Sequence, residues 1–339
     1  MTVTRVAVVG LGGIGALHAG ILNALPNCTL AAAVDKESKL IRLASKAIEN
    51  VKFYDDMVQM LDEQGPDCVF VCTPPDTHLP ITKSLLSHPR RPSAIFVEKP
   101  LALTTRDSEE IVMLAKEKDI ITGIGFQRRF LPTMRKAAEL IYQNSIGKLL
   151  FARCSYFVES VRTQGEGWRF DTHSGGVSLE LGVHMLDVMR MLFGEGKVVS
   201  SHTSQVVSNS CEDYATARMS FERVPHALFE VGWSMWGYNP AEFRVEVYGS
   251  RGSVVANQDR VDLIMLDVTG GIVHESWFAA QLTGSLPVLL GGPENVLIDL
   301  NFIESAQGKG RPEITFEDGL IVSKLANAIR GSTSLEGLK

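Results

Sequence analysis

The chain has 339 residues, more than twice the ~150 residues of a typical domain, which suggests two domains. Hydrophobic residues make up 45% and charged residues 21% of the chain, a composition that excludes a disordered, collagen-like or coiled-coil protein. The 33 basic and 39 acidic residues give a net charge of −6, so the chain lacks the basic surface typical of nucleic-acid-binding proteins. We therefore expect small-molecule partners and no nucleic acid.

Two features of the sequence bear on its cellular setting. The uncharged stretch from Val6 to Leu22 has the hydropathy of a signal or membrane segment, but glycines interrupt it and only Arg5 precedes it. We interpret it as a strand, a turn and a helix, and expect a soluble protein with no membrane partner. Five scattered cysteines, with Cys68 and Cys72 on one face of a buried strand, favour buried thiols over a redox pair. A reducing, cytoplasmic location is expected.

The first part of the chain alternates short apolar runs with helical patterns. Strands are predicted at residues 5–9, 30–34, 51–54, 68–71, 94–97 and 120–124. Helical patterns lie between them, including those at residues 14–25, 36–48 and 104–118. Alternating units of this length predict an α/β fold over residues 1–126, with a Rossmann-type, doubly wound parallel sheet covered by helices on both faces.

After residue 126 the alternation stops, and we predict a second α/β domain over residues 127–339. A long alternating run covers residues 149–158, an amphipathic helix covers residues 178–193, and residues 198–278 are mostly strand-like. Tight hairpins are predicted at residues 249–252 and 269–272. Two late helices, at residues 294–306 and 318–330, follow a loop at residues 283–293. This order predicts a mostly antiparallel open sheet with helices on one side.

A glycine-rich turn joins the first predicted strand to the first helix. Its sequence, Gly10-Leu-Gly-Gly-Ile-Gly15, fits the GxGxxG pattern in the strand–turn–helix context of dinucleotide sites. The first glycine allows the tight turn, the second lets the backbone approach the pyrophosphate, and the third lets helix and strand pack closely. The expected cofactor residues here are Gly10, Gly12, Gly13, Ile14 and Gly15. A glycine-rich turn without a ligand is the alternative.

An acidic residue closes the second predicted strand and bears on the choice of cofactor. Asp35 lies 20 residues after Gly15, where a carboxylate can bind a ribose 2′-hydroxyl. Because a carboxylate repels the 2′-phosphate of NADP, we expect NAD. The neighbouring Lys36 can offset that repulsion, so it is a further cofactor candidate and NADP stays possible.

The glycine motif and Asp35 are the first in an ordered series of motifs that together resemble one family. The series continues with Cys72-Thr-Pro-Pro-Asp-Thr-His78, Glu98-Lys99-Pro100, Gly125-Phe-Gln-Arg-Arg-Phe130, Trp168-Arg169, Gly175-Gly176 through Glu180 and His184 to Asp187, and Phe302 through Phe316-Glu-Asp-Gly-Leu320. This series resembles the glucose–fructose oxidoreductase/inositol dehydrogenase/rhizopine catabolism (Gfo/Idh/MocA) family. The resemblance covers nearly the whole chain.

The resemblance implies hydride transfer at a sugar or polyol carbon, with Lys99 and His184 as central catalytic residues. Glu180 stands where the family commonly has aspartate, and we place it with the catalytic and substrate-binding residues. The family's second domain often uses its open sheet in oligomer contacts, which implies a homo-oligomer, a dimer or tetramer. Additional cofactor contacts expected at the matching positions are Thr73, Pro74, Pro75, His78, Glu98, Lys99, Gln127, Arg128, Trp168 and Arg169.

The chemistry of an alcohol dehydrogenase gives these residues physical roles. Lys99 follows the fifth predicted strand, at the carboxyl edge where open α/β sheets bind ligands, and its ammonium can hydrogen-bond the reacting oxygen. A surface lysine paired with Glu98 is the alternative. Glu180, His184 and Asp187 share one helix face, and neighbouring carboxylates make His184 a suitable proton acceptor. A structural histidine is the alternative there.

The expected substrate site also draws on Arg169, Asp187 and Tyr238. Trp168 and Arg169 precede the helix and are interpreted as a wall beside the nicotinamide and the substrate, whereas Gln127 and Arg128 are equally compatible with a solvated basic turn. Tyr238 belongs to the loop at residues 233–240, which together with the loop at residues 157–171 is expected to select the substrate, although its aromatic residues are equally compatible with the core. No cysteine–histidine cluster is present in the sequence, so no metal is expected.

Three functions are compatible with these features. The leading hypothesis is a soluble NAD(P)-dependent dehydrogenase acting on a secondary alcohol of a sugar, sugar derivative or cyclitol. A second is a glycosidase-type enzyme that uses NAD transiently and returns it to its starting state in each cycle. A third is a non-catalytic dinucleotide-binding sensor, in which Glu180 marks a disabled site.

Overall fold

Short strands alternating with helices open the chain, and in the computed structural model they form a parallel sheet. The structure describes residues 3–159, 168–170, 175–267, 269–282 and 292–331. The chain divides into two compact units. The first consists of Met1–Phe126 and Pro287–Ile321, and the second of Gln127–Leu286 and Val322–Lys339.

The sheet of the first unit has six parallel strands in the order β3-β2-β1-β4-β5-β6. The strands are β1 (Thr4–Val9), β2 (Cys28–Val34), β3 (Lys52–Tyr54), β4 (Cys68–Val71), β5 (Ala94–Val97) and β6 (Ile121–Ile124). Every residue of β4 and β5 is buried, because helices cover both faces of a sheet of this kind. The strand order reverses between β1 and β4, which creates the switch point at which such sheets bind ligands. The predicted Rossmann-type fold is confirmed.

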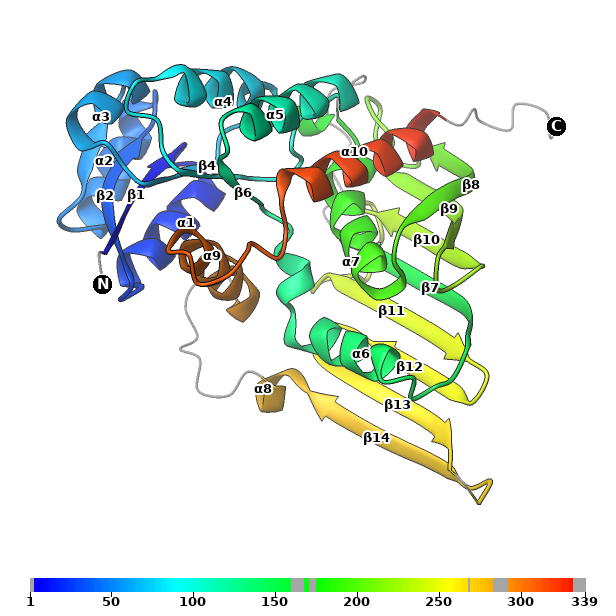
Figure 1. Ribbon diagram of the computed structural model, residues 1–339. Helices are drawn as coiled ribbons and strands as arrows, with labels where there is room; N and C mark the ends of the chain where they lie inside the picture. Colours follow the sequence, from blue (N-terminus) through cyan, green and yellow to red (C-terminus); the bar gives the residue numbers. More distant parts are fainter. Residues whose placement is uncertain (1–2, 160–167, 171–174, 268, 283–291, 332–339) are drawn as a thin grey trace. The chain divides into compact units, whose positions relative to one another are not determined.

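Helices flank this sheet on both sides (Figure 1). They are α1 (Gly13–Ala24), α2 (Ser38–Ala47), α3 (Met57–Gln64), α4 (His78–Ser87), α5 (Thr105–Glu117) and α9 (Pro293–Ala306). Two of them begin at side-chain caps, since the N–H of Gln59 donates to Asp56 at 2.7 Å and that of Asp107 donates to Thr104 at 3.1 Å. In Figure 1, α1 and α9 lie together on one side of the sheet, and α4 and α5 lie together on the other.

The second unit contains an eight-stranded sheet in the order β14-β13-β12-β11-β7-β10-β9-β8. The strands are β7 (Leu149–Phe157), β8 (Gly196–Ser204), β9 (Tyr214–Phe221), β10 (Ala227–Gly232), β11 (Glu242–Gly249), β12 (Gly252–Ala256), β13 (Arg260–Leu266) and β14 (Ile272–Phe278). β7 and β10 pair in parallel and the other neighbours are antiparallel, so the predicted mostly antiparallel sheet is confirmed.

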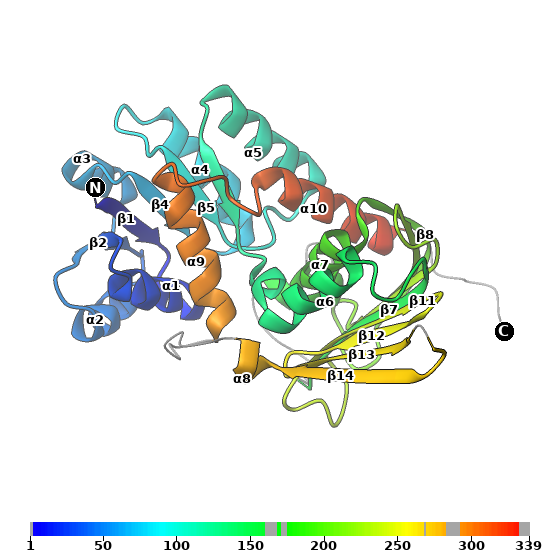
Figure 2. The ribbon, with the colours of Figure 1, turned by 60° about the horizontal axis from the view of Figure 1, so that its bottom comes forward.

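One face of this sheet is covered by α6 (Pro132–Tyr142) and α7 (Val183–Phe193), as Figure 2 shows. The strands alternate accordingly: in β11, Phe243, Val245 and Val247 are buried, and the residues between them are partly exposed. Among the described helices of this unit, which also include the short α8 (Ala279–Leu282), none lies on the opposite face (Figure 2). We refer to this opposite face, on which the described residues of the unit place no helix, as the open face of the sheet.

Several details differ from the sequence-based expectations. Helix α6 was not predicted, although it begins with Pro132 in its first turn. The predicted domain limits placed residues 287–321 in the second part of the chain, whereas the structure groups them with the first unit because α9 packs on α1 and β6. Helix α10 (Phe316–Gly331) begins in this segment. Residues 160–167, 171–174 and 283–291, which overlap the predicted loops at residues 157–171 and 283–293, lie outside the described residues.

Two further findings concern the cysteines and the helices. All five cysteines are buried and free, which confirms the interpretation of Cys68 and Cys72 as buried thiols. None of the helices in the described parts of the chain is long and apolar enough to cross a membrane.

Candidate functional site

The glycine turn between β1 and α1 has the geometry that a dinucleotide needs. Gly10 has φ +95°, and a Cβ there would lie 2.8 Å from the carbonyl oxygen of Cys72. A Cβ on Gly15 would lie 1.9 Å from the carbonyl oxygen of Gly10, so only glycine allows the helix to pack this closely on the turn. By contrast, a Cβ on Gly12 or Gly13 would meet no atom within 4 Å. The open side of the turn therefore leaves room for a pyrophosphate at the start of α1.

Two further observations support this fit. Gly12 is the N-cap of α1 and provides no side-chain cap, so backbone N–H groups of the first turn stay available to an anion. Gly13, the first residue of the helix, is exposed, and Ile14 is half-buried. The residues of the turn therefore fit the phosphates of NAD, and their contacts with the cofactor stay predictions.

Asp35 directly follows β2 and connects to the glycine turn. Its Oδ2 accepts the N–H of Leu11 at 2.6 Å, and its Oδ1 accepts the N–H of Glu37 at 2.8 Å. Each carboxylate oxygen keeps a second lone pair, which a ribose hydroxyl can use. The half-buried Asp35 and the exposed Lys36 thus stand at the predicted ribose position.

The loop after β4 lies at the same edge of the parallel sheet as the glycine turn. Pro74 is exposed, whereas Pro75 is buried at the start of a short 3₁₀ turn, and the hydroxyl of Thr77 donates to Thr73 Oγ1 at 2.6 Å. His78 is fully buried, and its Nε2 lies 2.9 Å from the carbonyl oxygen of Thr73. The loop is therefore rigid and internally bonded.

His78 also holds the loop after β5. Its Nδ1 lies 3.1 Å from the carbonyl oxygen of Pro100 and 3.2 Å from that of Leu101. Burial lowers the pKa of His78. Because both ring nitrogens face backbone carbonyl groups, this geometry favours a role in bracing the two loops, and direct contact with the cofactor stays a prediction.

Lys99 lies in that second loop, two residues after β5. It is half-buried, and its backbone N–H donates to Glu98 Oε2 at 3.1 Å. The Glu98 side chain points into the interior: it is 7% exposed, and its Oε1 lies 3.1 Å from Nε2 of His18. Gly125 leaves room for it, because a Cβ there would lie 2.2 Å from Glu98 Oε1. The glycine turn, the Thr73 loop and Lys99 follow β1, β4 and β5 at one edge of the parallel sheet.

In the second unit, one helix carries the predicted proton-handling residues. It starts with a turn of π-helix, Ser178–Gly182, and continues as α7. π-Helical turns are frequent at functional sites. His184 is 4% exposed, and its ring lies 6.5 Å from that of Tyr156, edge to face. Glu180 Oε1 lies 3.0 Å from Nε of Arg169, which is half-exposed.

Asp187 shares this helix but has another partner. It is fully buried, with Oδ2 accepting a hydrogen bond from Nε of Arg129 at 3.0 Å and Oδ1 paired with Nη2 of the same guanidinium. A doubly paired, buried carboxylate offers no exposed oxygen to a sugar hydroxyl. The geometry favours a structural role for Asp187, and the predicted substrate contact is not supported by it.

The other predicted residues of the second unit lie in three places. Gln127 begins a 3₁₀ turn, and the guanidinium of Arg128 donates to the Tyr156 hydroxyl at 3.1 Å and lies over that ring. Trp168 begins a second short turn, beneath the guanidinium of Arg169. Tyr238 is half-buried, with its ring 5.0 Å from that of Phe157.

Sequence reasoning missed several residues that support these groups. Glu212 accepts the N–H of Ser178 at 3.2 Å and lies 3.6 Å from Nε of Arg330, so it anchors the start of the helix that carries His184. Burial raises the pKa of Glu212. In the first unit, His18 bonds to Asp299 through Nδ1 and to Glu98 through Nε2. In the sequence, such a residue can be noticed only as an ionisable side chain within an apolar helical pattern. That pattern does not identify the residue with which it pairs.

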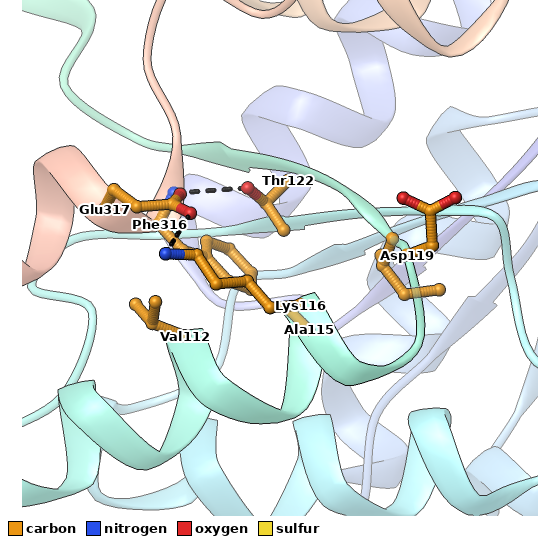
Figure 3. Close-up of a pocket in the computed structure, with 8 residues that line it drawn as sticks. Val112, Ala115, Lys116, Asp119, Thr122, Phe316 and Glu317 are labelled. Carbon is orange, nitrogen blue, oxygen red and sulfur yellow. Dashed lines mark hydrogen bonds and ion pairs between the residues drawn. The ribbon is translucent and has the colours of Figure 1, made fainter.

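A small cavity of the first unit lies at the opposite edge of its sheet (Figure 3). It is lined by Val112, Ala115, Lys116, Asp119, Ile120, Thr122, Phe316 and Glu317. Thr122 is at the amino end of β6, and Lys116 Nζ pairs with Glu317 Oε1 at 3.2 Å across the cavity. Because Rossmann-type sheets bind dinucleotides at the carboxyl edge, this cavity is not part of the cofactor site.

Comparison with known proteins supports a Rossmann fold that binds NAD. Residues 4–126 match the model of the oxidoreductase family with an NAD-binding Rossmann fold, and residues 134–255 match the GFO/IDH/MocA C-terminal domain. The chain is 28% identical over 269 residues to myo-inositol 2-dehydrogenase of Thermotoga maritima, covering 77% of this chain and 78% of the relative. It is 29% identical over 256 residues to scyllo-inositol 2-dehydrogenase (NAD(+)) of Bacillus subtilis, covering 74% and 72%.

A solved structure shows the same fold. Levoglucosan dehydrogenase in complex with NADH and levoglucosan superimposes with a TM-score of 0.84 at 21% identity, covering 97% of this chain and 96% of that chain. The fold thus has a counterpart along almost the entire chain. The chain belongs to the Gfo/Idh/MocA family of NAD-binding oxidoreductases.

Proposed function

We propose that this protein is an NAD-dependent dehydrogenase that oxidises a secondary alcohol of a sugar, sugar derivative or cyclitol. The observation that carries the proposal is the position of Lys99, which follows β5 at the sheet edge that also carries the glycine turn. The relatives named myo-inositol and scyllo-inositol 2-dehydrogenase support a cyclic polyol as the substrate class.

Each residue of the proposed site has a separate role in this reaction. NAD, when bound, supplies the acceptor for the hydride of the alcohol carbon. Lys99 donates a hydrogen bond to the reacting oxygen and holds it in place, which favours the alkoxide character that develops there. His184 accepts the hydroxyl proton. Glu180 and its partner Arg169 orient the substrate beside His184, and their 3.0 Å pairing fixes the carboxylate.

This assignment predicts large losses of turnover in two single variants. Lys99→Ala and His184→Ala should each lower kcat at least about 100-fold, because Lys99 donates a hydrogen bond to the reacting oxygen and His184 accepts its proton. The measurement is the rate of NADH formation with myo-inositol, scyllo-inositol and levoglucosan as trial substrates.

Two control variants remove a lysine and a histidine that lie outside the proposed site. Lys116→Ala deletes an exposed lysine at the opposite sheet edge, and His202→Ala deletes an exposed histidine on β8. Both controls should keep wild-type rates. Near-wild-type turnover in Lys99→Ala and His184→Ala would remove the catalytic assignment.

The open face of the second sheet supports a homo-oligomer, a dimer or tetramer, as part of the proposal. Phe151, Val199, Ile264 and Leu266 are large apolar residues that are at least 40% exposed. An apolar groove also lies on this sheet, lined by residues that include Phe151, Val199 and Leu228. Exposed apolar side chains on one face of a sheet favour a protein partner, so a second copy of the chain is the proposed occupant. Five free, buried thiols support a cytoplasmic location.

A further inference from the structure

Three ionisable side chains that the proposed mechanism does not use directly meet inside the first unit. His18 comes from α1, Asp299 comes from α9, and Glu98 directly follows β5. Their exposed fractions are 1%, 7% and 0%. His18 Nδ1 lies 2.8 Å from Asp299 Oδ1, and His18 Nε2 lies 3.1 Å from Glu98 Oε1. The imidazole thus joins two carboxylates that are 201 residues apart in the sequence.

The surroundings of this group are apolar. The His18 ring lies 5.5 Å from the ring of Phe70 and 5.4 Å from that of Phe96, and Phe302 packs against both phenylalanines. An unpaired charge has an unfavourable free energy in an apolar environment. The three side chains therefore stay paired and hold one another in fixed positions.

The geometry also defines the protonation state of His18. A neutral imidazole has one N–H. Both ring nitrogens face carboxylate oxygens, and when both carboxylates are ionised, both nitrogens must donate and the ring is an imidazolium. Burial alone lowers the pKa of His18, but the attraction and hydrogen bond of Asp299, together with those of Glu98, outweigh it and raise the pKa to about 10.

Glu98 connects this group to the proposed catalytic lysine. One oxygen of its carboxylate accepts from His18, and the other accepts the backbone N–H of Lys99 at 3.1 Å. His18 lies in α1, the helix that begins at the glycine turn, five residues after Gly13. The chain of bonds from α1 through His18 and Glu98 therefore ends on the backbone of Lys99.

We propose that His18 is a positioning residue that, held by Asp299, fixes Glu98 and thereby sets the backbone of Lys99 relative to the dinucleotide helix. This inference rests on the proposed function, because it requires Lys99 to act on the substrate. His18 touches neither substrate nor cofactor in this role. Displacements of about 1 Å at a reacting group are enough to lower turnover substantially.

The first test uses two variants that differ in which bond they keep. In His18→Gln the amide nitrogen can replace Nε2 and donate to Glu98, whereas in His18→Asn it can replace Nδ1 and donate only to Asp299. We expect His18→Asn to lower kcat about 10- to 100-fold relative to the wild type. The kcat of His18→Gln should be at least about threefold higher than that of His18→Asn. The Kd for NADH, measured by fluorescence titration, should change less than about threefold in both. If His18→Gln is no more active than His18→Asn, the proposal is overturned.

A double-mutant cycle separates positioning from general damage. If His18 acts through Lys99, His18→Asn should change the residual rate less than about threefold when Lys99 is already alanine. An equal loss in both backgrounds would overturn the inference while leaving the proposed function intact. Wild-type turnover in Lys99→Ala alone would instead overturn the proposed function, and the inference with it.

Amide hydrogen exchange supplies a readout that does not depend on activity. The peptide that contains Glu98 and Lys99 should exchange at least about tenfold faster in His18→Asn and in Asp299→Asn, because the acceptor of the Lys99 N–H is released. Phe302→Leu, a substitution in the same apolar cluster that breaks no hydrogen bond, serves as control and should leave this exchange unchanged. Unchanged exchange in both polar variants would overturn the proposal, and Asp299→Asn keeps the test decisive if His18→Asn does not fold.

Discussion

At the scale of single residues, the first unit contains a charge inside its core. His18 is an imidazolium bonded to Asp299 and Glu98, and all three side chains are buried. Removing one member of such a network leaves the others without compensation, which is far more destabilising than the loss of one surface ion pair. The stability of the protein should therefore respond to the protonation of His18.

The pH dependence of that response has a definite sign. The folded-state pKa of His18 is about 10, above its ordinary value of 6.5, so its contribution to stability is complete below pH 6.5 and is lost as the pH rises toward 10. The difference in Tm between the wild type and His18→Gln should be at least about 5 °C at pH 6 and should shrink steadily toward pH 10. Thermal unfolding at a series of pH values measures it. A difference that stays constant or grows with pH would contradict the imidazolium.

The glycine turn could be predicted from the sequence, whereas the His18–Asp299 pair could not. The spacing of Gly10, Gly15 and Asp35 is local, and each residue stands in the structure where the strand–turn–helix pattern predicts it. The partnership of His18 with Asp299 depends on the packing of α9 against α1, 281 residues away in sequence. No local pattern encodes such a distance, so the sequence could indicate a buried histidine but not its carboxylates.

At the scale of elements, the helix that carries Glu180 and His184 depends on an anchor at its start. The N–H of Val177 donates to the Glu212 carbonyl oxygen at 3.0 Å, and the N–H of Ser178 donates to the Glu212 carboxylate. Gly176 makes room for that carboxylate, because a Cβ there would lie 1.9 Å from Glu212 Oε2. The helix was predicted as one unit from its apolar face. Its first, π-helical turn was not predicted, because this anchor comes from a residue 34 positions from Ser178.

Substitution of Gly176 by alanine tests this anchor. Gly176 has φ +111°, so Gly176→Ala should cost about 2 kcal/mol or more in strain and steric displacement and should lower kcat about tenfold as the helix start moves. Gly308→Ala is the control, since Gly308 has φ +75° but a Cβ there would meet no atom within 4 Å. Chemical unfolding and steady-state kinetics measure both effects. Equal kinetic effects in the two variants would argue against the anchor.

At the scale of the whole molecule, the chain does not divide at a single point. Residues 287–321 return to the first unit, where α9 supplies Asp299 to the buried network. Composition and periodicity predicted helix α9 but not the unit to which it belongs, since an apolar helix face fits either sheet. The fold class could be predicted from the alternation of strands and helices. The return of the chain to the first unit could not, because it depends on tertiary packing.

The open face of the second sheet gives a prediction at the same scale. The wild-type protein should be a dimer or tetramer by light scattering, and Val199→Glu should shift the mass toward the monomer by placing a charge in the apolar groove. Leu43→Glu is the matched control, because Leu43 on α2 and Val199 are both 56% exposed. A monomeric wild type, or equal behaviour of the two variants, would refute the proposed interface.

The most direct measurement of the central claim is the accumulation of NADH with a panel of inositols, sugars and anhydrosugars. We expect at least one cyclic polyol to yield one NADH per molecule oxidised, with NAD preferred over NADP because of the Asp35 carboxylate. Substrate breakdown without net NADH would indicate a transient use of the cofactor. Tight binding of NADH without turnover of any compound in the panel would contradict a dehydrogenase altogether.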